Sequence, residues 1–429
     1  MSCPSETLRV AIVTSECGGT LVAAKAIERA VQRRFPSSIP SLILIDDLWP
    51  GSGVNSYQWY LLLAREGYYR LIHWLTSLEK RLLPFFEAPF LNGLSQKIKR
   101  ESHQPHILIS TVPFINVSLF KIAEELRIPL FVVTTDMDCR LYGVQWPKSE
   151  ELPPHRLGVV ARCPEVISRI PLEIDRSKLV FTGGFLKNEF ERGWTEEEKH
   201  ILRKEISFIP GREVVSLMMG SLGGRQIQEY VKRIILGEKL REWQKSAHFL
   251  IFCGKNGRLK TGLEQLVERE GFKKREKGVY ESKLGKIAFT FFDYLEAIAP
   301  YYALSCGLIT KPGSGSIHEA LSMNLPLMID KLNGHLPWEG LAAEIVEIYG
   351  LGSVLTDIER LPQLINEQFF DPFAREATCK RQLEFKALYN DPHSFSCRVG
   401  ETIEQLLVES RIRHTSVLEK KNSRPSPRP

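Results

Sequence analysis

The chain has no long apolar run. No segment reaches the roughly 20 consecutive apolar residues that a membrane-spanning helix requires, although 43% of the 429 residues are hydrophobic. The first residues, Met1–Glu6, supply no basic segment followed by an apolar one, so we expect no signal peptide. The length is sufficient for two α/β domains of ordinary size. These features predict a cytoplasmic protein.

The sequence also lacks cysteine pairs and an overall excess of charge. Its eight cysteines include no CxxC pair, which argues against a zinc site or a disulfide framework and favours free thiols. The net charge is +6, but the segment 411–429 holds six basic residues and one acidic residue. The rest is nearly neutral, so no nucleic-acid partner is expected. We predict that 411–429 is a disordered basic tail, either simply solvated or a tether to anionic lipid.

What the chain does contain is a repeated alternation of short apolar runs and helical patterns. In the first half, strands are expected at 8–14, 41–46, 106–110, 130–134 and 158–161, with helices at 22–34 and 115–126. The pattern restarts with strands expected at 214–219, 248–253, 287–291, 308–310 and 327–329. Repeated βα units predict parallel sheets covered on both faces by helices.

The most informative segment is Gly307–Leu321. It reads as a strand, a loop of small residues and a helix start, in which Gly313, Ser314, Gly315 and Ser316 form the turn. Backbone N–H groups and the positive end of the helix dipole would then hold a diphosphate. Glu319, one turn into the helix, would accept hydrogen bonds from sugar hydroxyls. The alternative is a βα loop that binds nothing.

The run Thr310-Lys-Pro-Gly-Ser-Gly-Ser-Ile-His-Glu-Ala-Leu321 resembles the donor-binding signature of the family 28 GT-B glycosyltransferases. These include the monogalactosyldiacylglycerol synthases and other diacylglycerol glycosyltransferases and, more distantly, the N-acetylglucosaminyl transferase that forms lipid II. Other segments fit the same family in the same order: Ser15–Ile27, Thr134–Asp136, Cys253–Asn256, Phe291–Asp293 and Pro337–Glu339. The resemblance implies two facing Rossmann-like domains with parallel sheets and a cleft between them.

The resemblance also implies a domain organisation. The expected parts are an acceptor-binding, membrane-facing domain at 1–180, a nucleotide-sugar-binding domain at 181–390, a helix at 391–410 that crosses back to the first domain, and the tail at 411–429.

For the donor, a UDP-sugar, the resemblance implies a set of contacts in the second domain. They are Gly220, Ser221, Gly254, Asn256, Phe292, Gly313, Ser314, Gly315, Ser316, Glu319, Trp338 and Glu339. Alternatives stay open: Gly220–Gly224 as a plain turn, Phe292 as core and Trp338 as loop packing. No cofactor or metal is expected, because Asp136-Met-Asp138 lies in the first domain and GT-B enzymes use helix dipoles and amides in place of a metal.

The region 55–105 interleaves aromatic and basic residues. We expect an amphipathic helix pair lying on an anionic membrane surface, with a membrane lipid as acceptor. The residues expected to contact acceptor or membrane are Gly18, Gly19, Trp59, Tyr60, Arg65 and Trp74. The alternative is an ordinary core with a solvated cationic face.

The chain departs from its relatives in the first glycine-rich loop. They place a histidine where this chain has Thr20, and no histidine occurs between Met1 and Ile72. Glu16 and Asp136 are the remaining candidates for a general base, although Asp136 could be an ordinary turn residue. His318 is interpreted as a helix-surface residue.

The expected function is an inverting transfer of a hexose from a UDP-sugar to a membrane lipid, diacylglycerol before others, by a peripherally bound enzyme. The sugar itself is left open, because the sugar-contacting loop keeps only Glu339 and Gly340 of the family pattern. Alternatives are a polyprenyl-linked acceptor, a nucleotide-sugar epimerase, and a catalytically degenerate partner subunit.

Overall fold

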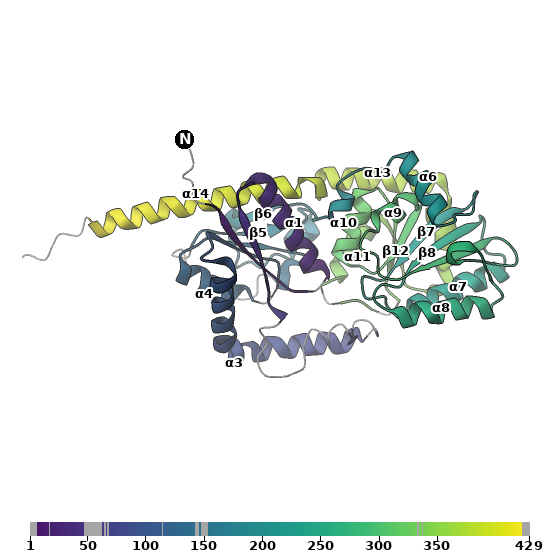
Figure 1. Cartoon of the computed structure of the whole chain (residues 1–429), viewed down its shortest axis with the longest axis horizontal. Helices are drawn as coiled ribbons and strands as arrows, with labels where there is room; N and C mark the ends of the chain where they lie inside the picture. Colours follow the sequence, from purple (N-terminus) through teal and green to yellow (C-terminus); the bar gives the residue numbers. More distant parts are fainter. Residues whose placement is uncertain are drawn as a thin grey trace, which may run out of the picture.

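The structure is a computed structural model in which two α/β sheets stand side by side (Figure 1). The described residues are 7–46 without Cys17, 62–63, 66, 68–113, 115–141, 146, 153–332, 334–336 and 338–422.

The first sheet has six parallel strands. In spatial order they are β2 (Ile39–Leu44), β1 (Arg9–Thr14), β3 (Ile107–Ser110), β4 (Leu130–Val133), β5 (His155–Val159) and β6 (Leu179–Phe181). The central strands are completely buried because helices cover both faces, as expected for apolar runs without alternation. The helices of this part are α1 (Gly18–Arg34), α3 (Tyr69–Ser102), α4 (Asn116–Leu126) and α5 (Pro164–Ser168).

The second sheet has eight strands. In spatial order they are β14 (Gly352–Leu355), β13 (Leu327–Asp330), β12 (Gly307–Thr310), β7 (Glu213–Met218), β8 (Ala247–Phe252), β11 (Ile287–Phe292), β10 (Val279–Glu281) and β9 (Lys273–Lys274). The expectation of a fully parallel sheet was wrong at one edge, where β10 pairs antiparallel with both β11 and β9. Strands β10 and β9 have only three and two residues, which is too few to show a hydrophobic period in the sequence.

Helices connect the strands of the second sheet and lead back to the first. They are α6 (Glu196–Glu205), α7 (Ile227–Lys239), α8 (Gly257–Arg269), α9 (Ala299–Leu304), α10 (Ser314–Ser322), α11 (Gly340–Ile348), α12 (Leu361–Ile365), α13 (Pro372–Leu388) and α14 (Phe395–Asn422). One apolar cluster runs from the core of the first sheet through α10 and α11 and into α14, so the two sheets share part of their core.

The last helix, α14, crosses from the second sheet to the first, packs against α1, β5 and β6, and extends beyond them (Figure 1). Val399, Ile403 and Leu406 of this helix are buried. The helix ends at Asn422, past the expected end at residue 410. The sequence offers no helix breaker there, since the next proline is Pro425.

Helix α3 is one continuous helix of 34 residues in place of the expected helix pair. It runs below the first domain, and its N-terminal end points toward the second (Figure 1). Ile72 in its first turn packs against Leu336 of the second domain. Within the described residues, no helix combines the length and apolarity needed to cross a membrane.

Candidate functional site

The topology of the second sheet marks one place for a ligand. The chain enters at β7, adds β8 and β11 on one side, and then returns to add β12 on the other. Adjacent parallel strands whose connections leave in opposite directions open a crevice at their carboxyl ends. The loop after β7 and the loop after β12 meet at this crevice, and both had been singled out in the sequence.

The loop after β7 depends on two glycines with positive φ. Gly220 has φ 78° and Gly223 has φ 72°. A Cβ on Gly220 would stand 3.1 Å from Cε of Lys311, and a Cβ on Gly223 would collide with the carbonyl oxygen of Cys253. Glycine is therefore required at both positions, both for the turn and for the close approach of the neighbouring loops.

Lys311 lies at this candidate site, although the sequence analysis quoted it within the motif without giving it a role. Its side chain lies against Gly220 and 3.6 Å from the position of a Cβ on Gly313. Its Nζ pairs with Oε1 of Glu339 at 2.5 Å. The lysine therefore stands between the two glycine loops. Its place after β12 and directly before the Pro-Gly turn was the available signal.

Helix α10 begins at the same crevice. Its N-cap, Gly313, has no side chain with which to cap the first-turn N–H groups, which leaves that end suited to an anion. Ser314, however, is 2% exposed, and its Oγ accepts a hydrogen bond from the Met137 N–H of the first domain at 3.2 Å. Gly315 and Ser316 follow in the first turn. This end of α10 therefore joins the two domains.

Glu319 is buried and ion-paired. Its Oε1 lies 3.1 Å from Nζ of Lys187, which belongs to the segment joining β6 to α6. Burial raises the pKa of Glu319, and the charge of Lys187 partly opposes that rise. A sugar hydroxyl would have to share this carboxylate with Lys187.

Asp136, after β4 of the first domain, lies at the same boundary. Its carboxylate accepts a hydrogen bond from Thr135 Oγ1 at 3.2 Å. Burial and the nearby charge of Glu339 raise the pKa of Asp136 to about 7, against the opposing effects of Thr135 and Lys311. A carboxylate with such a pKa is suited to general-base catalysis near neutral pH.

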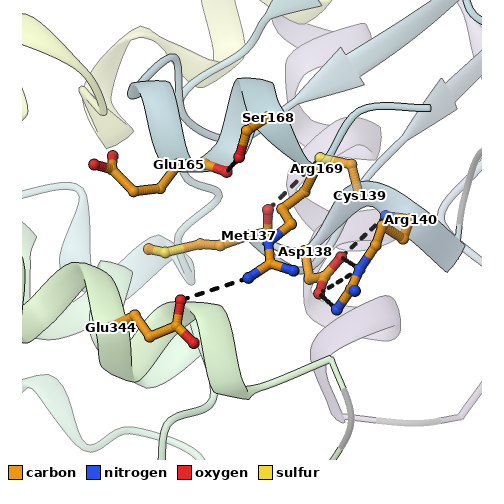
Figure 2. Close-up of polar contacts among 8 residues, drawn as sticks. All are labelled: Met137, Asp138, Cys139, Arg140, Glu165, Ser168, Arg169 and Glu344. Carbon is orange, nitrogen blue, oxygen red and sulfur yellow. Dashed lines mark hydrogen bonds and ion pairs between the residues drawn. The ribbon is translucent and has the colours of Figure 1, made fainter. Parts of the chain in front are cut away.

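The rest of the loop after β4 is structural. Figure 2 shows Asp138 turned to Arg140, whose Nε donates to Oδ1 and whose Nη2 donates to Oδ2 of the carboxylate. The same view shows Arg169 of the first domain facing Glu344 of α11 at 3.6 Å. The domains are also joined by a hydrogen bond that Tyr349 Oη donates to Oε2 of Glu165 at 2.8 Å.

The first glycine-rich loop, which follows β1, contributes less to the candidate site. Glu16 is exposed, and its N–H donates to Oδ2 of Asp46 at 2.8 Å. Thr20, in the position of the family histidine, is buried, and its Oγ1 lies 2.8 Å from Oγ of Ser15. A Cβ on Gly18, the first residue of α1, would lie 3.4 Å from Oγ of Ser221. Gly18 thus faces the loop after β7, whereas a Cβ on Gly19 would have nothing within 4 Å. Cys17 is outside the described residues.

Three other expected donor contacts are engaged within the second domain. Asn256 caps α8 by accepting from the Leu259 N–H at 3.2 Å. Gly254 packs against the backbone of Ser221. The carbonyl of Phe292 accepts from the Cys253 N–H at 2.9 Å, and its ring stacks on Phe252.

The apolar residues near the start of α3 divide into two groups. Trp338, half-buried, packs with Leu336 and with Ile72 of α3. Trp74, by contrast, is 59% exposed. Trp59, Tyr60 and Arg65 lie outside the described residues.

The interpretation of His318 as a helix-surface residue was wrong. Its side chain is completely buried and lies edge-on to Phe185. Among the residues that the structure describes, neither ring nitrogen finds a hydrogen-bond partner, and burial lowers the pKa of His318 to about 3. A Cβ on Gly184 would come within 2.5 Å of the ring, so this histidine packs against the connection between the domains. The sequence missed this because α10 is covered on both sides.

No protein-family model matches the chain. The chain is 24% identical over 241 residues to the processive diacylglycerol β-glucosyltransferase of Bacillus licheniformis, covering 56% of this chain and 54% of that protein. It is also 27% identical over 185 residues to a UDP-N-acetylglucosamine–N-acetylmuramyl-(pentapeptide) pyrophosphoryl-undecaprenol N-acetylglucosamine transferase of Bacillus thuringiensis. This match covers 42% of this chain and 44% of that protein. The chain therefore spans about half the length of the curated relatives it matches.

Among solved structures, Medicago truncatula UGT71G1 complexed with UDP-glucose aligns with a TM-score of 0.59 at 15% identity, covering 94% of this chain and 98% of that one. Acinetobacter baumannii MurG aligns with a TM-score of 0.54 at 11% identity, covering 89% and 95%. The two-sheet architecture expected from the sequence is thus confirmed as the GT-B fold.

Proposed function

From a chain with the GT-B fold, related at low identity to diacylglycerol glucosyltransferases and to N-acetylglucosamine transferases, we propose an inverting glycosyltransferase. It would move a hexose from a UDP-sugar to the hydroxyl of a membrane lipid, with diacylglycerol as the preferred candidate acceptor. One observation carries the proposal: Lys311, the start of α10 and Asp136 meet at the switch point of the second sheet.

Each group has a chemical task in this proposal. The Lys311 ammonium and the first-turn N–H groups of α10 would hold the diphosphate and stabilise the charge that develops on it as the sugar leaves. Glu319 would hold the ribose hydroxyls, and Glu339 with Trp338 would hold the sugar. The acceptor oxygen would attack the anomeric carbon from the opposite face, while Asp136 takes its proton.

Approach of the two domains would complete the site. Asp136 belongs to the first domain and Lys311 to the second, so the base and the donor seat come together only when the domains are in contact. Contact would also exclude water, which would otherwise hydrolyse the donor.

The lipid acceptor rests on two further observations. The printed activity of the Bacillus licheniformis relative concerns diacylglycerol. In addition, the N-terminal part of α3 exposes Leu71 and Trp74, which would enter a bilayer surface. A polyprenyl-linked acceptor is the second candidate, because the Bacillus thuringiensis relative is named for one.

The test is transfer of labelled sugar from UDP-glucose and UDP-galactose to diacylglycerol in mixed vesicles. Glu319→Ala should abolish the labelled glycolipid, whereas Glu347→Ala, an exposed glutamate on α11, should leave it unchanged. Release of UDP without lipid would favour a hydrolase, and conversion of the UDP-sugar into its epimer without lipid would favour an epimerase. UDP binding without any product, even with a polyprenyl phosphate acceptor, would favour a degenerate partner subunit.

A further inference from the structure

The loop that follows β4 carries the candidate base and also reaches the second domain. Asp136 stands in this loop directly before Met137, whose N–H donates to Ser314 Oγ in the first turn of α10 at 3.2 Å. The charges of Glu339 and Lys311, both in the second domain, act on the Asp136 carboxylate. The path of this one loop therefore sets how the base lies relative to the donor seat.

Within the loop, Asp138 and Arg140 form a clamp. The Arg140 backbone N–H donates to Asp138 Oδ1 at 3.1 Å, and the Arg140 Nε donates to the same oxygen at 2.9 Å. The Arg140 Nη2 donates to Oδ2 at 2.5 Å, so both carboxylate oxygens are bound (Figure 2). A bidentate arginine–carboxylate pair fixes an orientation as well as adding energy. The clamp therefore holds the backbone from residue 138 to residue 140 in one shape.

The loop depends on this clamp because of the way it is buried. Asp138 is 2% exposed, whereas the side chain of Arg140 is 55% exposed. A buried carboxylate is costly without a partner, and within the described part of the chain the cation paired with Asp138 is Arg140. The other arginine in the same view, Arg169, faces Glu344 at 3.6 Å (Figure 2). Loss of Arg140 would thus leave Asp138 without its cation.

The clamp can influence chemistry only through the loop that it shapes. Its neighbours Met137 and Cys139 are completely buried, and Cys139 Sγ donates to the Met137 carbonyl at 3.7 Å. Among the described residues, no hydrogen bond or ion pair of Asp138 or Arg140 reaches the second domain. Any effect of these two side chains on sugar transfer would therefore pass through Asp136 and Met137.

We propose that Asp138 and Arg140 are positioning residues for sugar transfer. They shape the loop so that Asp136 faces the donor seat and the Met137 N–H reaches Ser314. The inference rests on the proposed function, since it takes Asp136 as the base. A displacement of about 1 Å away from the reacting atoms can cost on the order of 10²-fold in rate, so a pair that touches no substrate would still control turnover.

The test compares Arg140→Met, Asp138→Asn and the double variant in steady-state transfer on vesicles. Arg140→Met should lower kcat by about 10–100-fold and leave the KM for the UDP-sugar within about threefold, because the donor contacts lie in the second domain. The double variant should lose no more than Arg140→Met alone, since the two side chains act as one unit. The control Arg176→Met replaces an exposed arginine of the first domain and should keep the wild-type rate.

The pH profile separates positioning from a general loss of folded protein. The charge of Asp138 is one of the effects that raise the pKa of Asp136. In Asp138→Asn the midpoint of the kcat profile should therefore move to lower pH, since Glu339 and Lys311, the other charged groups acting on Asp136, remain. Arg140→Met keeps the Asp138 charge and should not move the midpoint in that direction. Partial unfolding would lose active molecules at every pH and leave the midpoint unchanged.

Hydrogen exchange gives a readout that requires no activity. The Met137 amide is protected by Ser314 Oγ, so its exchange in the full chain should accelerate by about tenfold or more in Arg140→Met and stay unchanged in Arg176→Met. Unchanged exchange in Arg140→Met, or losses of rate that multiply in the double variant, would overturn the clamp. An effect confined to the KM for the lipid would overturn it as well, because Arg140 would then contact the acceptor.

The two readouts keep this inference distinct from the proposed function. If the wild type transfers no sugar and the exchange of Met137 responds as expected, the proposed function fails while the clamp's hold on the loop stands. If the wild type transfers sugar and the exchange does not respond, the clamp fails and the function stands.

Discussion

Asp136 stands among charges of both signs, and their balance sets its pKa. Burial and Glu339 disfavour the carboxylate, whereas Thr135 and Lys311 favour it. The result, a pKa raised to about 7, is unusual for an aspartate and is typical of functional sites. Glu16, the other candidate base, is exposed in the loop after β1.

We expect Asp136→Asn to lower the transfer rate by about 10²–10⁴-fold, the usual contribution of a general base. Glu16→Gln should change it by less than about threefold, since the Glu16 side chain is exposed in the loop after β1. Steady-state rates on vesicles check both. Comparable losses in the two variants, or a larger one in Glu16→Gln, would reassign the base.

The raised pKa also predicts a pH dependence with a definite sign. Transfer should increase as the pH rises through about 7, because the base acts deprotonated. The free energy of unfolding should fall as the pH rises from about 4 to about 7, because the folded chain binds the Asp136 proton more tightly than the unfolded chain does. Asp136→Asn should therefore stabilise the protein at pH 8 by about 1–2 kcal/mol, a value reduced for partial exposure, as thermal unfolding would show.

Burial of His318 predicts the opposite dependence of stability on pH, namely a loss of stability as the pH falls into the acid range. Its pKa is lowered to about 3 by burial, whereas the unfolded residue titrates near 6.5, so stability is lost as the pH falls below about 6.5. His318→Phe, which fills the same space beside Phe185, should remove this loss, on the order of 3 kcal/mol at pH 4. Denaturant unfolding at pH 7 and pH 4 measures it. The exposed His200→Gln is the control, and an unchanged pH slope in His318→Phe would contradict the assignment.

At the scale of elements, the start of α3 has one side buried against protein and another side exposed. Ile72 is buried against Leu336, while Leu71 and Trp74 are exposed. A helix that packs on one side and exposes large apolar residues on the other is suited to an interface between protein and lipid.

The double variant Leu71→Gln, Trp74→Gln should weaken binding to neutral vesicles by about 10–100-fold, because the apolar area that enters the bilayer is lost. The control Leu172→Gln, Leu284→Gln replaces residues that are 91% and 64% exposed elsewhere. Flotation separates the two variants. Equal vesicle binding by both would exclude α3 as the membrane contact.

At the scale of the whole molecule, α14 ties the sheets together. It leaves the second domain, buries Val399, Ile403 and Leu406 against the first, and adds an ion pair between Glu409 and Arg156. The buried part of the helix therefore matters for stability, while its far end extends beyond the body of the molecule.

Ending the chain after Arg413 should shift the midpoint of thermal unfolding by no more than about 2 °C, because the buried contacts remain. Leu406→Ala should destabilise by about 2–5 kcal/mol, the usual cost of a cavity at a fully buried leucine. Calorimetry compares the two. A truncation as damaging as Leu406→Ala would assign a packing role to the end of α14.

The sequence by itself determined the two βα series, the loop at Gly220, and the strand–loop–helix unit ending in Glu319, because period and turn residues act over a few neighbours. It could not find β9 and β10, which are too short to have a period, nor the end of α14, where no breaker stands.

Tertiary structure alone decided which residues meet. Lys311 pairs with Glu339, 28 positions further along the chain and beyond α10 and β13, and Asp136 approaches both from another domain. Burial turned His318 into a core residue and raised the pKa of Asp136 to about 7. The reason is physical: desolvation and Coulomb energy depend on distances in space, and the spacing of residues along a chain carries no record of them.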